Sequence, residues 1–237
     1  MTAIHPVDHQ RPYELVIQHS LSWLLFTCVI GCLLATLLLV PSFGVMLEPL
    51  GYGRWATVHL DASLYGWASV PLIGLLFLLF LPNGKPGRLV SAATPVWSGM
   101  ILFAMVGWLA GHTSGKLFME WEGAERWDVL AGMAFLALAL WVDGARRIRA
   151  DYLAGARVVA AAKVIVLAGL SLIPVVMYAA SDPALYPPVN PDSGGATGGS
   201  LLGSTLGLIV IYWVAPFILG IPSLVSWRRH APVLFLL

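Results

Sequence analysis

The chain has 237 residues, of which 59% are hydrophobic and only 11% are charged, and its mean hydropathy is +0.83. Soluble domains carry about a quarter charged residues, so this composition excludes an ordinary soluble domain and indicates a protein that is surrounded mostly by lipid. A formal net charge of +1, with dispersed basic residues, argues against nucleic acid or another polyanion as a partner.

Apolar segments long enough to cross a bilayer as helices follow one another along the chain. We predict six spans, at residues 16–40, 56–81, 92–112, 127–145, 156–180 and 200–226. Backbone amides must be satisfied inside lipid, which favours helices, and the spans lack the alternating pattern of a membrane barrel. The prediction is an all-α, polytopic membrane bundle of about six transmembrane helices, with residues 1–237 forming one membrane domain.

The distribution of Lys and Arg predicts the orientation of these spans. Most of these residues fall on one side: Arg11, Lys85, Arg88, Arg146, Arg147, Arg149, Arg157, Arg228 and Arg229. Arg54, Lys116 and Arg126 fall on the other side, and Lys163 lies within the fifth span. The positive-inside rule therefore places both termini in the cytoplasm.

The second span begins in the stretch GYGRWATVHLDASLYGW, which contains His59 and Asp61. We expect His59 about one turn below the outer surface, where an ionisable residue is a functional candidate. A neutral imidazole can ligate haem iron through one nitrogen while an acceptor holds its other N–H. The alternative is an interfacial histidine bonded to a loop carbonyl. Asp61 is only two residues further on, so it is expected to point elsewhere.

His112 ends the third span, at the membrane level predicted for His59. The two histidines could ligate one haem, or they could be two unrelated interface residues. The stretch GHTSGKLFMEWEGAERWD then supplies Glu120 and Glu122, whose oxygens suit calcium. Two carboxylates are few for such a site, and the alternative is a solvated acidic loop in which Lys116 pairs with Glu120.

Two further charged residues lie toward the cytoplasmic side. Lys163 is expected to extend its ammonium to the membrane interface rather than to form a proton path. Asp143 is expected to pair with Arg146 or Arg147, which follow it by three and four residues.

Two of these stretches together resemble the first half of subunit I of the haem-copper oxidases, in particular the C-type (cbb3) branch and the related nitric oxide reductases. GYGRWATVHLDASLYGW is similar to that branch's Gly-Arg, short spacer and haem-ligand His near the start of the second helix. GHTSGKLFMEWEG resembles its G-x-T-x-G-K-x-x-x-E-x-E loop after the third helix. The resemblance covers residues 11–150, where the order and spacing of the spans also fit.

The resemblance implies roles for several residues and partners. His59 would be one axial ligand of a low-spin haem b, and Gly53 and Arg54 would match the entry to its helix. Glu120 and Glu122 would match acidic positions near the haem propionates, where this branch can hold calcium. The implied setting is a respiratory complex of a bacterial inner membrane, with further membrane subunits and a c-type cytochrome donor on the acidic outer face.

The chain also departs from the family's pattern. The family's sixth helix opens with a W-W-x-G-H-N-like motif whose His binds copper, whereas this chain has SLLGSTLGLIVIYW, with Ser204 or Thr205 at that position. No histidine lies between His112 and His230, so no copper is expected in this chain. Either a partner chain completes a split subunit I, or this relative has lost the copper–haem centre, in which case His112 is the obvious substitute ligand.

The sequence therefore predicts a membrane subunit of a cytochrome c oxidase-like complex that helps to hold haem b for electron transfer and is not catalytic alone. The alternative, from another class, is a haem-free membrane scaffold or assembly subunit of a larger complex. A channel or secondary transporter is less well supported, because the sequence has no inverted repeat and few charges within its spans.

Overall fold

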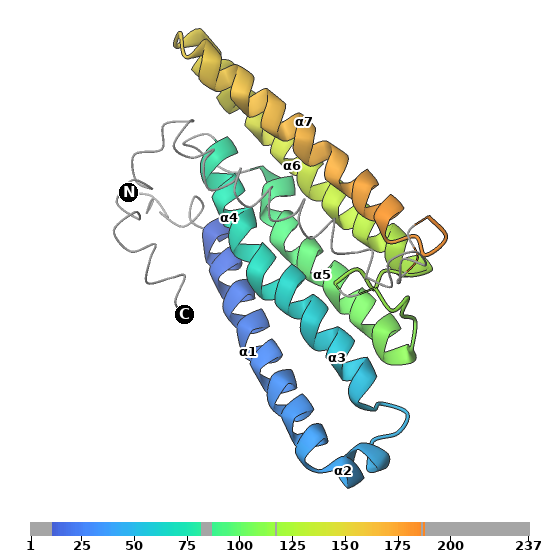
Figure 1. Cartoon of the computed structure of the whole chain (residues 1–237). Helices are drawn as coiled ribbons and strands as arrows, with labels where there is room; N and C mark the ends of the chain where they lie inside the picture. Colours follow the sequence, from blue (N-terminus) through green and yellow to red (C-terminus); the bar gives the residue numbers. More distant parts are fainter. Residues whose placement is uncertain (1–10, 82–86, 117, 186, 188–237) are drawn as a thin grey trace, which may run out of the picture.

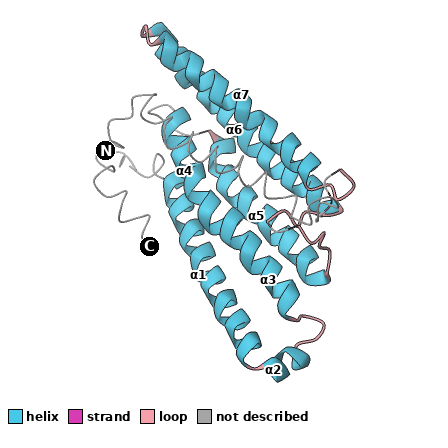
Figure 2. Ribbon diagram, in the orientation of Figure 1, coloured by secondary structure: helices cyan, strands magenta, loops and turns pink. Residues whose placement is uncertain are grey.

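A computed structural model describes residues 11–81, 87–116, 118–185 and 187 of the chain. Every regular element in this part of the chain is a helix, as Figure 2 shows. Five helical segments are long and apolar enough to cross a membrane. The chain is therefore an integral membrane protein with an all-α fold.

The helices follow one another in the order that the hydropathy pattern predicts. They are α1 (Arg11–Leu39), α2 (Pro41–Met46), α3 (Tyr52–Asp61), η2 (Ala62–Ala68), α4 (Ser69–Phe80), α5 (Arg88–Ala110), α6 (Ala124–Leu153) and α7 (Arg157–Ala180). The elements α3, η2 and α4 form one continuous span, and α2 is a short helix outside the predicted spans. The first five predicted spans are confirmed, and the sixth, at 200–226, lies outside the described residues.

The fourth span is longer than the sequence predicted. The prediction ended at residue 145, where the Arg-rich segment begins, but α6 continues to Leu153 and contains 30 residues. Such a helix is about 45 Å long, which exceeds the thickness of a hydrocarbon core of about 30 Å. An ion pair between Arg147 and Asp151, four residues apart at 3.4 Å, supports the additional turns.

The spans form a bundle in which the second span lies between its neighbours (Figure 1). α1 packs against α3, η2, α4 and α5, while α6 packs against α4 and α5. α7 lies along α6, with which it forms a hairpin. The core between these helices is made of fully buried side chains such as Phe77, Phe80, Ile101 and Leu140. Apolar side chains such as Leu25 and Val29 are exposed on the other face of α1, as expected for a surface that contacts lipid.

The middle of the second span is a π-helix that the sequence analysis did not predict. η2 covers seven residues, from Ala62 to Ala68, and begins immediately after Asp61. Gly66 lies against α1, where a Cβ atom would come within 2.7 Å of the Trp23 ring, so only glycine permits this close approach. π-helical turns are frequent at functional sites, and this one directly follows the turn that carries His59.

Candidate functional site

His59 lies on α3 and turns its imidazole toward α1. It is seven residues from the first residue of α3, so it lies about 10 Å, or about two turns, along the helix from that end. Its Nδ1 is 3.0 Å from the Thr27 carbonyl oxygen. A carbonyl can only accept a hydrogen bond, so Nδ1 donates it, and in the neutral imidazole the lone pair is then on Nε2. Nε2 has no hydrogen-bond partner among the described residues, and this is the tautomer that an iron ligand needs.

Asp61 ends α3 and occupies different surroundings from His59, as the sequence predicted. Its side chain is 1% exposed, and neither carboxyl oxygen has a hydrogen-bond partner in the described part of the chain. The carboxyl lies close enough to Glu120 and to Tyr65 for electrostatic interaction with both. Asp61 is therefore part of a polar group inside the bundle, separate from the contact between His59 and α1.

The loop between α5 and α6 folds back into the bundle. Trp121 is fully buried and packs edge-on against two rings, with centroids 4.9 Å from Tyr65 and 5.3 Å from Trp108. The hydroxyl of Tyr65 donates to the Phe118 carbonyl at 2.6 Å, and the indole N–H of Trp108 donates to the Glu120 carbonyl at 2.6 Å. This part of the chain is therefore not the solvated acidic loop that the sequence analysis gave as the alternative, because Trp121 and Glu120 are buried.

Glu120 holds this loop in shape through its carboxylate. One oxygen, Oε2, accepts hydrogen bonds from the backbone N–H groups of Ser114, at 2.7 Å, and Gly115, at 2.9 Å. Burial raises the pKa of Glu120, although these hydrogen bonds act in the opposite direction. Two successive N–H groups that converge on an anion in this way form a nest. Oε2 of Glu120 therefore already has its hydrogen-bond partners.

The described residues contain no set of ligands for the expected calcium ion. Oε2 of Glu120 faces N–H donors rather than an open site, and within the described ranges the carboxylate of Glu122 has no hydrogen bond or ion pair. Across the described ranges, no group of three or more His, Cys, Asp and Glu side chains is placed to hold a metal ion. Calcium binding by Glu120 and Glu122 therefore remains a prediction from the sequence.

Lys116 is buried and binds the end of α7 rather than Glu120. Its side chain is 2% exposed, and its ammonium donates to the carbonyl oxygens of Ala180, at 2.7 Å, and Asp182, at 2.8 Å. The last carbonyls of a helix have no partners within the helix and carry the negative end of its dipole, so a cation is favourable there. The predicted ion pair with Glu120 is absent. Burial lowers the pKa of Lys116, and the nearby Asp182 carboxylate acts to raise it.

Arg126 is a second cation at the same end of α7. It donates to the Tyr178 carbonyl at 2.9 Å and to the Asp182 carboxylate at 3.1 Å, and its guanidinium lies 4.3 Å from the centre of the Tyr178 ring. The Ala184 N–H, and after it Arg126, lowers the pKa of Asp182. Lys116 and Arg126 together join the outer end of α7 to the loop and to α6.

His112 lies just beyond α5 and faces α6. Its side chain is 63% exposed, and its Nδ1 is 3.2 Å from a carboxyl oxygen of Glu125, which is buried. His59, by contrast, is bonded to α1. The structure does not bring the two imidazoles together, and each is held by a different helix.

The two histidines also differ in depth, which corrects the prediction that they share one level. Arg54 donates to the Leu109 carbonyl, so residue 54 lies beside the last turn of α5. His59 is five residues further along α3, which is about 7–8 Å deeper, whereas His112 follows the end of α5. Arg54 is therefore in the predicted helix entry, where it ties α3 to α5.

His19, the other histidine of a described span, has its own partner and does not approach His59. Its Nδ1 is 2.7 Å from the Ser98 hydroxyl of α5, which also accepts the indole N–H of Trp23 at 3.0 Å. This agrees with the expectation that His19 does not share a site with His59.

The predicted cytoplasmic half contains an ion pair of Asp143 within α6 and an ion pair of Lys163 between α6 and α7. Asp143 pairs with Arg146, as predicted, and also accepts the Gly87 N–H at the start of α5, at 2.8 Å. Lys163 is 4% exposed and pairs with Asp151 at 2.6 Å. Lys163 therefore has a partner that the sequence analysis did not predict, because the additional turns of α6 bring Asp151 to it.

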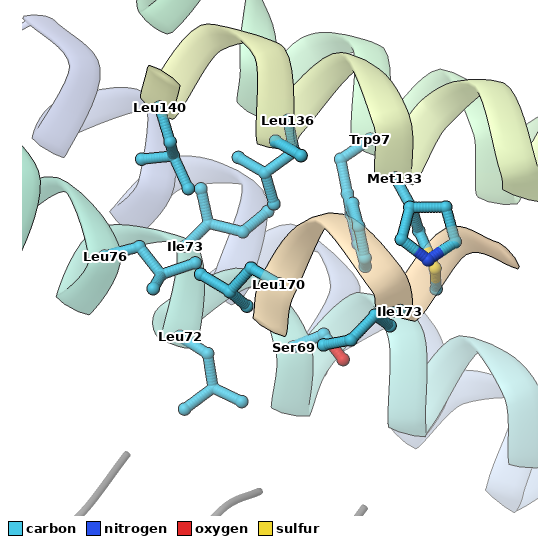
Figure 3. A pocket seen from close by; sticks show the side chains of 12 residues that line it. Ser69, Leu72, Ile73, Leu76, Trp97, Met133, Leu136, Leu140, Leu170 and Ile173 are labelled. Carbon is cyan, nitrogen blue, oxygen red and sulfur yellow. The ribbon is translucent and has the colours of Figure 1, made fainter. Parts of the chain in front are cut away.

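An apolar pocket lies between α4, α5, α6 and α7 (Figure 3). Leu72 and Ile73 of α4, Leu136 of α6 and Ile173 of α7 are among its lining residues. Ser69 is the only lining residue with a hydroxyl, and this hydroxyl donates to the Leu64 carbonyl at 2.7 Å. No α1 residue lines the pocket, so it is separate from the contact that holds His59.

Comparison with known proteins identified no relative of this chain. No protein family model, curated protein or solved structure matches the chain. The candidate site is therefore defined by its geometry, with His59 as the candidate metal ligand because its Nδ1 is bonded to a backbone carbonyl within the bundle.

Proposed function

We propose that this chain is a membrane subunit of a respiratory, cytochrome c oxidase-like complex of the haem-copper superfamily, in a bacterial inner membrane. In this proposal His59 is an axial ligand of a low-spin haem b. Support comes from the two stretches that resemble subunit I of the C-type branch, and from the location of both within a bundle of transmembrane helices.

The observation that carries the proposal is the hydrogen bond from His59 Nδ1 to the Thr27 carbonyl. It selects the neutral tautomer with its lone pair on Nε2, and it makes that nitrogen a stronger donor. When bound, haem b supplies one-electron transfer. The residues of this chain would hold the imidazole in place, and the hydrogen bond to its Nδ1 would influence the reduction potential.

The described part of this chain offers one ligand to this haem, because the imidazoles of His59, His112 and His19 are each held by a different helix and do not converge. In the proposal, partner membrane subunits supply the second axial ligand and any copper site. The chain is then not catalytic alone, and a c-type cytochrome on the outer face is the electron donor.

The test is a reduced-minus-oxidised visible spectrum of the complex, purified gently with its native partners. We expect a b-type band in the wild type and its loss in His59→Ala, because the iron loses its ligand. The matched control is His19→Ala, which removes another intramembrane imidazole but one that is bonded to Ser98, and which should leave the band in place. A wild-type complex without haem would refute the proposal and favour the haem-free scaffold instead.

A further inference from the structure

The surface of α1 that faces His59 has no side chain at its point of closest approach. That point is Gly31, one turn after Thr27. A Cβ atom at Gly31 would lie 3.1 Å from Cε1 of His59, 3.7 Å from Nδ1 and 3.8 Å from Nε2. The imidazole edge therefore occupies the space where any other residue would place its side chain.

Two other glycines of the spans provide matched comparisons for Gly31. A Cβ atom at Gly99 of α5 or at Gly169 of α7 would meet nothing within 4 Å. At Gly31 the separation of 3.1 Å is tighter than ordinary van der Waals contact, so a methyl group would displace the ring by a few tenths of an ångström. The ring cannot yield freely, because its Nδ1 is bonded to Thr27 on the same helix.

We propose that Gly31 is a positioning residue for His59: the bare surface of α1 at Gly31 and the Thr27 carbonyl one turn earlier together set the direction of Nε2. This inference rests on the proposed haem-binding function. A hydrogen bond fixes the tautomer but leaves the ring able to rotate about it, whereas a contact along the ring edge restricts that rotation. Metal ligands need this second restraint, because small displacements of a ligating group weaken its bond to the metal.

The experiment compares Gly31→Ala with Gly99→Ala in the purified complex, by low-spin ferric haem electron paramagnetic resonance and redox titration. We expect Gly31→Ala to retain haem but to shift the resonance positions and to raise the midpoint potential. The potential rises because a displaced ring donates a weaker Nδ1 hydrogen bond, which makes Nε2 a less basic ligand and stabilises ferric iron less. Gly99→Ala adds the same methyl group in open space and should change neither readout.

A larger variant and a wild-type measurement keep the inference testable if Gly31→Ala does not assemble. Gly31→Val should lose most of the haem, whereas Gly99→Val should retain it. In the wild type, electron–nuclear double resonance should find a ligand Nδ1 proton that resists exchange in D₂O.

The outcomes separate the two proposals. A wild-type haem signal that is unchanged in Gly31→Ala, or an Nδ1 proton that exchanges at once, overturns the role of Gly31 and leaves His59 as the ligand. A wild-type complex without haem overturns both.

Discussion

The charged side chains of the loop between α5 and α6 bind backbone groups, and their neighbours in the sequence do not indicate these partners. Lys116 lies in an acidic stretch, yet its ammonium binds two carbonyl oxygens at the end of α7. Glu120, four residues later, accepts backbone N–H groups of the loop itself. Each charge thus satisfies backbone groups that would otherwise be buried without partners, and this allows the loop to enter the bundle.

Lys116→Met tests this interpretation at the scale of one residue. The variant keeps the aliphatic length of the side chain but leaves two carbonyl oxygens without their charged donor, so the free energy of unfolding should fall by about 2 kcal/mol. Thermal unfolding of the purified protein in detergent measures the change. Arg149→Met, which removes an exposed cation from α6, is the control and should have little effect. Equal midpoints for the two variants would contradict the role of Lys116.

At the scale of the element, two helices differ from the simple apolar spans that the hydropathy pattern predicts. The second span changes from α-helix to π-helix at Ala62, which alters the direction of the residues that follow. α6 continues past its apolar part to Leu153 because the polar residues there have partners, namely Arg147 within the helix and Lys163 on α7. The α6–α7 hairpin is therefore joined by an ion pair near its turn.

Asp151→Asn tests this pairing. It leaves the Lys163 ammonium buried without a counter-charge, and breaking a buried ion pair in this way should lower the free energy of unfolding by about 3 kcal/mol. The double variant Asp151→Asn/Lys163→Met removes both charges and should recover most of that loss. Denaturation curves of the three proteins provide the comparison. If the double variant were as unstable as Asp151→Asn, the buried charge would not be the cause.

At the scale of the whole molecule, the charge distribution predicts the orientation in the membrane, and the bundle assigns each turn to one end. The turn between α6 and α7, at residues 154–156, lies at the end opposite to the loop of Lys116 and the end of α7. The positive-inside rule places that turn in the cytoplasm. This orientation decides which face would meet a c-type cytochrome donor.

Cysteine labelling of intact cells tests the orientation. In a background with Cys28 and Cys32 replaced by serine, Leu185→Cys should react with a membrane-impermeant thiol reagent, because it is exposed at the predicted outer end. Ala154→Cys, which is exposed in the opposite turn, should react only after the cells are permeabilised. The reverse pattern would invert the topology and move the donor face to the other end.

The sequence by itself determined the five described spans and the pairing of Asp143 with Arg146 or Arg147, of which the structure shows Arg146. Lipid leaves a backbone few alternatives to a helix, and residues three apart on one helix are neighbours whatever surrounds them. The tertiary structure alone decided that His59 faces Thr27 while His112 faces Glu125, and that Trp121 is buried. These outcomes depend on how helices that are distant in the sequence are rotated and packed against one another, and a local hydropathy pattern does not predict this packing.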